Sequence, residues 1–222
     1  MKRIAKYQFI TTDTERHSHA DLAELACLGG AGWVQLRVKN KDDEEWCAIA
    51  EEVRDICRKY QATFIINDNV ALASSLDADG VHLGRNDMPI KEARNILGPD
   101  KIIGGTANTA EDIINLARQG ADYVGLGPYR FTDTKENLDA ILGLQDIKLI
   151  VAESQKAIGA AIPIVAVGGI KRDDILPILQ AGLFGCAVSG AVVKSEYMII
   201  ASAKFAHQLR TIAKQLQNAS IT

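Results

Sequence analysis

The sequence predicts a single-domain (β/α)8 TIM barrel spanning residues 1–222. Three observations lead to this fold class. Eight short apolar runs alternate with helical patterns, the connections are mostly short, and one phrase recurs four times where a helical pattern gives way to the next run. Eight alternating strand and helix units fit a closed parallel barrel, with an open doubly wound sheet as the competing arrangement.

The eight apolar runs are the predicted strands. Most are almost continuously apolar, as expected of parallel strands that are covered on both faces. They are YQFIT from residue 7, WVQLR from 33, TFIIN from 63, DGVHL from 79, KIIGG from 101, DYVGL from 122, PIVAV from 163 and FGCAV from 184.

Helical patterns fill the intervals between these strands. HADLAELACLG is expected to begin after an N-cap at Ser18 and to end at Gly29, and TAEDIINLARQG to begin at Thr109 and end at Gly120. The stretch 42–60 carries an apolar stripe, and residues 145–158 also have a helical pattern. The segments KRDDILPILQAG and AVVKSEYMIIASAKFAHQLRTIAKQLQ follow the last two strands.

The recurring phrase marks the junction between one unit and the next. It is written AGWVQLR from residue 31, DADGVHLG from 77, GADYVGLG from 120 and AGLFGCAVSG from 181. We interpret each copy as a helix that ends at a turn residue, a small residue that allows close packing, and a strand that enters the barrel.

Composition and charge exclude several classes of protein. The formal net charge is −3, so no basic face predicts binding to nucleic acid or to an anionic membrane. No apolar run approaches the roughly 20 residues of a membrane span, and the N-terminus does not resemble a signal peptide. The four cysteines form no C-x-x-C pair, so we interpret them as buried reduced thiols of a cytoplasmic protein. Small-molecule ligands are therefore the expected partners, and a homo-oligomer is left open.

Active sites of such barrels lie at the carboxyl ends of the strands. After the second strand, Gln35, Arg37 and Lys39 share one face of an extended segment, and Val34, Leu36 and Val38 face the other way. Two cations at the mouth of a barrel indicate an anionic ligand. A solvated strand end is the alternative.

Two carboxylates follow the next two strands. Asn67 and Asp68 end the third strand, and Asp87 lies in the loop after the fourth. Beside two cations they suggest Mg²⁺ bridging to a phosphorylated ligand, because Mg²⁺ uses few carboxylates together with phosphate oxygens and water. Taken singly, each aspartate could instead cap the helix that follows it.

Hydroxyl groups and glycines occupy the remaining strand ends. Thr106 ends the fifth strand, and Thr132, Thr134 and Lys135 begin a long connection after the sixth. VGGI after the seventh strand and VSGA after the eighth predict a phosphate site made by backbone N–H groups, with tight turns as the alternative.

The four histidines give weaker signals. His82 lies within the fourth strand and is interpreted as a packed, hydrogen-bonded residue rather than a catalytic one. His17 and His19 are expected in a solvated loop, and His207 is expected to be a structural residue of the last helix.

The motifs together resemble the thiamine phosphate synthase (thiamine-phosphate pyrophosphorylase) family. QLRVK, IINDNVALA, ADGVHLGRNDMP, GADYVGLGPYRFTDTK, IVAVGGI and AVSGA occur in the family's order and span nearly the whole chain. The resemblance implies a Mg²⁺-dependent transferase. It would join 4-amino-2-methyl-5-hydroxymethylpyrimidine diphosphate to 4-methyl-5-(2-phosphonooxyethyl)thiazole, giving thiamine phosphate and diphosphate.

The resemblance also implies roles for individual residues. Asp68 and Asp87 would bind Mg²⁺. The substrate-binding residues would be Gln35, Arg37, Lys39, Asn67, Thr106, Thr132, Thr134, Lys135, Gly169, Val188 and Ser189. Of these, the residues implied in catalysis beside the diphosphate are Arg37, Lys39, Thr106 and Lys135. The chain departs from the family pattern at Val38, Arg85 and Thr106.

Two rival functions use parts of the same site. A thiazole tautomerase of the same superfamily would need only the thiazole phosphate and an acid or base, for which His82 is the candidate. A non-catalytic module that binds a phosphorylated ligand would need neither the cations nor the carboxylates together. The full set of cations and carboxylates argues against both.

Overall fold

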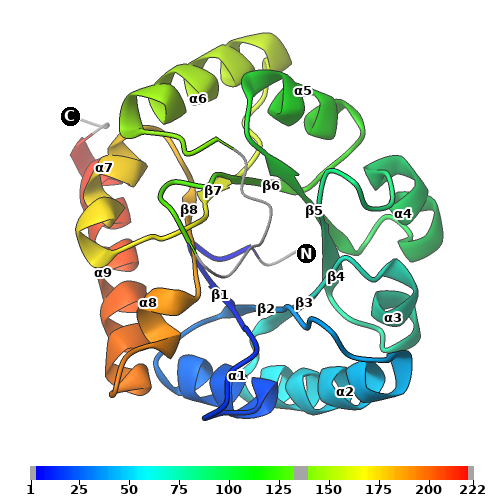
Figure 1. Ribbon diagram of the computed structural model, residues 1–222. Helices are drawn as coiled ribbons and strands as arrows, with labels where there is room; N and C mark the ends of the chain where they lie inside the picture. Colours follow the sequence, from blue (N-terminus) through cyan, green and yellow to red (C-terminus); the bar gives the residue numbers. More distant parts are fainter. Residues whose placement is uncertain (1–3, 133–139, 220–222) are drawn as a thin grey trace.

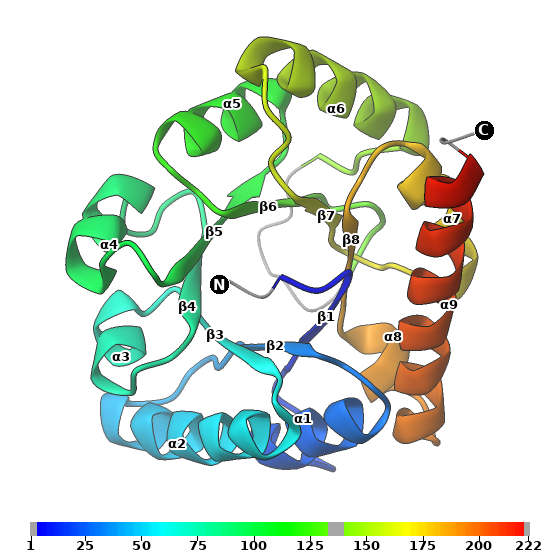
Figure 2. The ribbon, with the colours of Figure 1, turned by 180° about the vertical axis from the view of Figure 1, so that it is seen from behind.

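Eight parallel strands close into a barrel in chain order, and helices form a ring around them (Figures 1 and 2). This computed structural model describes residues 4–132 and 140–219. The strands are β1 (Tyr7–Ile10), β2 (Trp33–Leu36), β3 (Thr63–Asn67), β4 (Gly80–Leu83), β5 (Ile102–Ala107), β6 (Tyr123–Leu126), β7 (Ile164–Ala166) and β8 (Gly185–Val188). All eight predicted strands are confirmed, and the pairing of β1 with β8 excludes the open sheet.

Helices follow the strands around the outside of the barrel. They are α1 (His19–Leu28), α2 (Asp43–Tyr60), α3 (Val70–Ser75), α4 (Ile90–Leu97), α5 (Ala110–Arg118), α6 (Leu144–Ile158), α7 (Ile175–Gln180), α8 (Gly190–Val193) and α9 (Met198–Ala219), with a short 3-10 helix η1 (Arg172–Asp174) before α7. Ser18 and Thr109 cap α1 and α5 as predicted, each in a capping box with an aspartate three residues on. None of the described helices is long and apolar enough to cross a membrane.

A residue with left-handed backbone lies at the first residue of each copy of the recurring phrase or next to it. Gly30, Asp77, Gly120 and Gly182 have φ angles of 89°, 52°, 89° and 89°. After Gly30 and Gly120, the N–H of the next residue donates to the carbonyl five residues earlier. These bonds run from Ala31 to Ala26 (3.0 Å) and from Ala121 to Leu116 (3.0 Å). This is the hydrogen bond of a Schellman helix end, so the repeated sequence encodes a repeated helix stop.

Alternation along the strands divides the apolar side chains into two layers. One small cluster fills the inside of the barrel and consists of Trp33, Ile65, Ile102, Tyr123, Val165 and Ala187. The larger cluster, which includes Val34, Leu36 and Val38, lies between the barrel and its helices. The segment before β1 packs Ile4 and Ala5 against the inner cluster.

The final helical segment differs from the prediction, because it is interrupted. α8 ends at Val193 and α9 begins at Met198, with a turn between them. Within the turn Ser195 N–H donates to the Val192 carbonyl (3.0 Å), and the Ser195 hydroxyl accepts from Tyr197 N–H (3.2 Å). A short polar side chain that bonds the backbone competes with helix continuation, which accounts for the break.

Candidate active site

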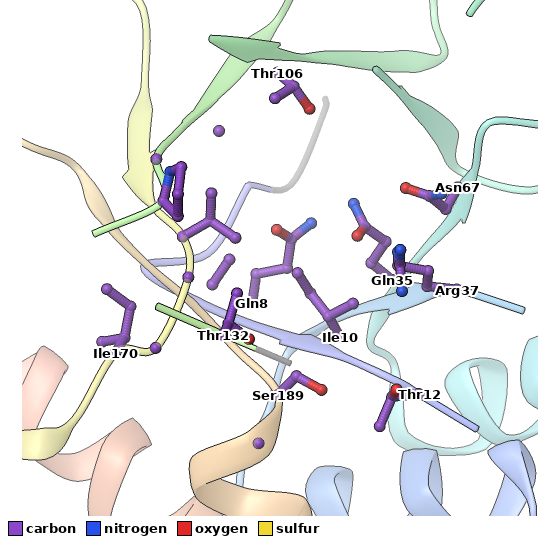
Figure 3. A pocket seen from close by; sticks show the side chains of 18 of the residues that line it. Gln8, Ile10, Thr12, Gln35, Arg37, Asn67, Thr106, Thr132, Ile170 and Ser189 are labelled. Carbon is purple, nitrogen blue, oxygen red and sulfur yellow. The ribbon is translucent and has the colours of Figure 1, made fainter. Parts of the chain in front are cut away.

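A cavity of about 1350 Å³ lies at the carboxyl ends of the strands (Figure 3). Residues from all eight strand ends or the loops after them line it. The predicted site residues among its lining are Gln35, Arg37, Lys39, Asn67, Asp68, Asp87, Thr106, Thr132, Gly169 and Ser189. Thr134 and Lys135 lie outside the described residues.

The polar face of β2 and the residues after it meets the cavity, as the alternation predicts. Gln35 is buried, and its side chain bonds the Tyr123 hydroxyl inside the barrel. Arg37 N–H donates to the Thr11 hydroxyl oxygen (3.1 Å), which fixes the backbone at the point where the Arg37 side chain enters the cavity. Arg37 and Lys39 are both half-buried and line the cavity.

Asp68 does not cap α3, so that alternative is wrong. The cap is the neighbouring Asn69, whose side-chain oxygen accepts from Leu72 N–H (2.9 Å). Asp68 itself has a φ of 65° and donates its backbone N–H to the His82 carbonyl (2.8 Å). Left-handed backbone at a residue other than glycine is uncommon and concentrates at functional sites. Here it accompanies a carboxylate at the cavity.

Asp87 does not cap α4 either. α4 begins after Pro89, and Asp87 Oδ2 instead accepts from Gly84 N–H at 2.6 Å. A Cβ on Gly84 would lie 2.8 Å from that carboxylate oxygen, so glycine is needed for this turn. The turn holds one carboxylate oxygen in a fixed place at the rim.

The two aspartates fit a magnesium site that is completed by substrate. Asp68 and Asp87 follow the adjacent strands β3 and β4, and both line the cavity. Within residues 4–132 and 140–219 no three histidine, cysteine or carboxylate side chains gather into a metal cage. A pair of carboxylates with phosphate oxygens and water suits Mg²⁺, whereas structural zinc requires four protein ligands.

Hydrogen bonds join several polar side chains inside the barrel. The Tyr123 hydroxyl accepts from Gln8 Nε2 (3.3 Å) and lies 2.9 Å from His82 Nδ1, and His82 Nε2 lies 3.0 Å from the Thr106 hydroxyl. Burial raises the pKa of Tyr123, so the phenol stays protonated. His82 is hydrogen-bonded through both ring nitrogens, as the sequence interpretation expected.

Two glycines make room for this arrangement. A Cβ on Gly104 would lie 2.1 Å from the Tyr123 ring, and one on Gly125 would lie 3.3 Å from the His82 ring. Sequence reasoning missed Gln8 and Tyr123 as site residues. The available signal was a lone amide in the apolar run YQFIT, placed like Gln35 to point inward.

The loops after β7 and β8 form the opposite side of the cavity, where Ser189 and Ile170 lie in Figure 3. Gly168 and Gly169 have φ angles of 93° and 61°, so VGGI makes a tight turn. A Cβ on Gly169 would lie 2.8 Å from Arg130 Cβ, which shows that packing also requires this glycine. The Ser189 hydroxyl is buried, and it has no hydrogen-bond partner among the described residues.

The side chain of Val188, unlike that of the neighbouring Ser189, does not line the cavity. Its side chain is buried in the outer cluster between barrel and helices. Only the backbone of Val188 can therefore face a ligand in the cavity. Ala187, Ser189 and Gly190 line the cavity around it.

Contacts tie the loop after β6 to the loop after β7. Arg130 forms an ion pair with the buried Asp174, and this contact raises the pKa of the Arg130 guanidinium. Tyr129 N–H donates to the Val167 carbonyl (2.9 Å). Arg130 lines the cavity together with Lys171 and Lys194, three cations that sequence reasoning did not include. Thr132 is thereby held at the edge of the same cavity.

Two minor expectations need correction. His19 is not solvated, because it is buried and bonded to Thr11 and Asp13. Cys47 is half-buried, whereas the other three cysteines are buried and all four are free thiols. Arg85, a departure from the family pattern, lies at the cavity but pairs with Asp112 of α5 (3.2 Å).

Comparison with known proteins gives one family. Residues 7–192 match the model of the family described as thiamine monophosphate synthase. A thiamine-phosphate synthase of Bacteroides thetaiotaomicron is 45% identical over 87% of this chain and 92% of its own length. One from Flavobacterium johnsoniae is 46% identical over 86% and 90%. The solved thiamine phosphate pyrophosphorylase of Pyrococcus furiosus is 33% identical, with a TM-score of 0.79 over 95% of this chain and 96% of that one.

Proposed function

Because the chain belongs to the thiamine monophosphate synthase family, we propose that its cavity binds a pyrimidine diphosphate on the β2–β4 side and a thiazole phosphate on the β7–β8 side. The activity is that of a thiamine-phosphate synthase, a transferase of thiamine biosynthesis. One observation supports the assignment of the two substrates to the two sides of the cavity. Arg37, Lys39 and the two carboxylates lie at one side of the cavity. The other side has no carboxylate among its described lining residues; it has the turn glycines, Lys171, Lys194 and the buried Ser189 hydroxyl, which has no hydrogen-bond partner among the described residues.

Charged residues would bind the diphosphate at one side of the cavity. Arg37 and Lys39 would contact the phosphate oxygens, with the Asn67 amide beside them. Asp68 and Asp87 would hold Mg²⁺, which the family generally uses. When bound, the ion would neutralise the charge that develops on the departing diphosphate.

The pyrimidine would lie above the hydrogen-bonded side chains inside the barrel. Gln8 and Gln35 offer amide donors and acceptors to ring nitrogens and an amino group. The hydroxyl of Thr106, bonded to His82, lines the same cavity. Tyr123 stays neutral, so no buried charge is left beside an uncharged ring.

The thiazole phosphate would occupy the turn glycines after β7 and the start of α8. Backbone N–H groups of Gly169 and Val188 and the hydroxyl of Ser189 would bind its oxygens, with Thr132 at the edge. A phosphate would give the buried Ser189 hydroxyl the partner that the described residues do not provide. The resemblance adds Thr134 and Lys135, which lie outside the described residues.

The reaction requires that the two substrates be positioned and that the charge on the leaving diphosphate be neutralised. Carbon–oxygen bond cleavage leaves a pyrimidine methylene cation and diphosphate, and the thiazole nitrogen then attacks the methylene carbon. Arg37 and Lys39 would stabilise the leaving group where its charge develops. The two phosphate sites at opposite sides of the cavity would hold the thiazole nitrogen in line with the pyrimidine methylene carbon. No side chain need act as a nucleophile.

The tautomerase alternative has less support. It requires a residue that exchanges a proton with the substrate. His82, the candidate, is bonded through both ring nitrogens to Tyr123 and Thr106. The carboxylate pair would have no purpose in that reaction, nor in a non-catalytic module. The buried reduced thiols suit a cytoplasmic setting.

Two purified substrates and Mg²⁺ test the proposal. We expect thiamine phosphate to form with both substrates and Mg²⁺, to stop with EDTA, and to resume with added Mg²⁺. Arg37→Ala should raise KM for the pyrimidine diphosphate, and Ser189→Ala should raise KM for the thiazole phosphate. The assignment of the two ends is wrong if these effects are exchanged.

A further inference from the structure

A chain of hydrogen bonds links a buried histidine to the backbone of Arg37. His19 Nδ1 lies 2.8 Å from the Thr11 hydroxyl oxygen, and the same oxygen accepts from Arg37 N–H at 3.1 Å. The other ring nitrogen, His19 Nε2, lies 3.2 Å from Asp13 Oδ1. Thr11 is 0% exposed and His19 is 7% exposed, so protein groups must satisfy both.

The donors and acceptors agree with only one direction along this chain. The Thr11 oxygen takes the proton of Arg37 N–H, and the Thr11 hydroxyl then gives its own proton to Nδ1 of a neutral His19. His19 Nε2–H donates to the Asp13 carboxylate. Every buried donor has an acceptor in this arrangement. A histidine protonated on Nδ1 would leave the buried Thr11 proton without an acceptor among residues 4–132 and 140–219.

The Thr11 side chain continues the pairing of β1 with β2. Ile10 is paired with Gln35, and Thr11 N–H donates to the Gln35 carbonyl (2.9 Å). At Arg37, directly after β2, the backbone N–H has the Thr11 hydroxyl as its acceptor instead of a backbone carbonyl. The orientation of that hydroxyl therefore fixes the backbone of Arg37, directly before its side chain enters the cavity.

Helix capping does not explain why His19 is buried here. His19 is the first residue of α1, but the cap is the hydroxyl of Ser18, which accepts from Asp21 N–H (3.1 Å). The Asp21 carboxylate completes the capping box by accepting from Ser18 N–H (3.0 Å). A nucleophilic role for Thr11 is also excluded, because its oxygen is buried and already accepts from Arg37 N–H.

We infer that His19 is a positioning residue for diphosphate binding, acting through the Thr11 hydroxyl on Arg37. This inference rests on the proposed function, which gives Arg37 its ligand. A fixed backbone at Arg37 sets the point from which its side chain reaches the diphosphate, so less conformational freedom has to be lost on binding.

Two substitutions of His19 separate its two contacts. His19→Asn keeps an oxygen near the position of Nδ1 and so keeps an acceptor for Thr11. His19→Gln keeps a polar group near the position of Nε2 for Asp13 and loses the acceptor. We expect His19→Gln to weaken binding of Mg²⁺–diphosphate by about tenfold, the value of one lost hydrogen bond, and His19→Asn by about twofold at most.

Thr11 provides an independent pair of variants. Thr11→Val removes the hydroxyl and should weaken Mg²⁺–diphosphate binding as His19→Gln does, whereas Thr11→Ser keeps it. His17→Gln is the matched control, because His17 belongs to the same segment but contacts Thr14 through its backbone. Circular dichroism melts show that folded proteins are compared. If His19→Gln and His19→Asn weaken binding equally, the effect is one of packing and the inference is wrong.

A double-mutant cycle with Arg37→Ala separates this inference from the proposed function. Isothermal titration with Mg²⁺–diphosphate gives the affinity of each variant. If His19 acts through Arg37, His19→Gln adds no further loss in the Arg37→Ala background. Equal losses in both backgrounds overturn the role of His19 while leaving that of Arg37 intact. An Arg37→Ala protein of wild-type affinity would overturn the proposed diphosphate site, and the inference with it. In kinetics, KM for the thiazole phosphate should stay unchanged in His19→Gln.

Discussion

His82 Nε2 lies 3.0 Å from the Thr106 hydroxyl oxygen at the cavity, so a half-buried imidazole orients a hydroxyl that lines the cavity. Gln8 donates to the Tyr123 hydroxyl, whose own proton is available for His82 Nδ1. Nε2–H then donates to Thr106 and leaves the threonine proton for a ligand. We assign this tautomer of His82 from the hydrogen-bond partners of its two ring nitrogens.

Thr106→Val should lower kcat/KM by about one to two orders of magnitude, the value of one hydrogen bond to a charged group. Thr106→Ser should stay close to wild type, because serine keeps the hydroxyl. His82→Asn should lower kcat/KM only modestly, because asparagine retains a partner for Tyr123 and removes only the hydrogen bond to Thr106. Steady-state kinetics of thiamine phosphate formation measure all three. Complete loss of activity in His82→Asn would instead indicate a proton-transfer role.

Substitution of the aspartates tests the magnesium site. Asp68→Asn is the cleaner variant, because asparagine tolerates the left-handed backbone at φ 65° and only the charge is lost. We expect about a hundredfold loss of kcat that higher Mg²⁺ partly restores. Asp87→Asn should behave similarly, with an added loss of stability if its bond to Gly84 N–H weakens. Full activity of Asp68→Asn in EDTA would exclude the site.

Ser189 gives a test of the thiazole phosphate site that leaves the fold alone. Its buried hydroxyl has no partner among the described residues, so Ser189→Ala should not lower the melting temperature. It should raise KM for the thiazole phosphate by about tenfold and leave KM for the pyrimidine diphosphate unchanged. Gly169→Val is a poorer test, because its new side chain would collide with Arg130 and disturb the β6 loop. An unchanged KM in Ser189→Ala would place the phosphate elsewhere.

Local sequence signals were sufficient for the barrel and for the residues at its strand ends. Alternation alone places Gln35 and Arg37 toward the cavity and Val38 in the outer layer, because strand geometry has a fixed period. The helix ends predicted at Gly29 and Gly120 were equally visible, since the left-handed backbone found at Gly30 and Gly120 favours glycine.

Contacts across the barrel and between loops could not be predicted. The bond of Tyr123 to Gln8 joins residues 115 positions apart, and it depends on the room left by Gly104. His19 was expected in solvent because its neighbours in sequence are polar, but α1 turns it toward Thr11. The capping alternative for Asp68 stayed open because sequence alone does not show which residue of the pair Asp68–Asn69 has left-handed backbone.

The buried His19 should make the free energy of unfolding depend on pH. Burial lowers its pKa, the Asp13 carboxylate opposes this shift, and the charge of Lys41 adds to it. The unfolded chain binds a proton at the ordinary pKa near 6.5, while the folded protein binds it only at lower pH. Between these values the unfolded state holds more protons, so stability is complete above about pH 6.5 and falls as pH drops below it.

Urea unfolding of wild type and His19→Asn from about pH 8 down to about pH 5 measures this contribution. We expect the wild type to lose more stability on acidification than His19→Asn, whose side chain does not titrate. The carboxylates and the remaining histidines are common to both proteins, so they cancel in the comparison. His17→Gln should keep the wild-type slope, because it leaves His19 and Thr11 in contact. Parallel pH profiles for wild type and His19→Asn would mean that His19 takes up its proton in the fold without cost, contrary to the directed hydrogen bonds that place Arg37.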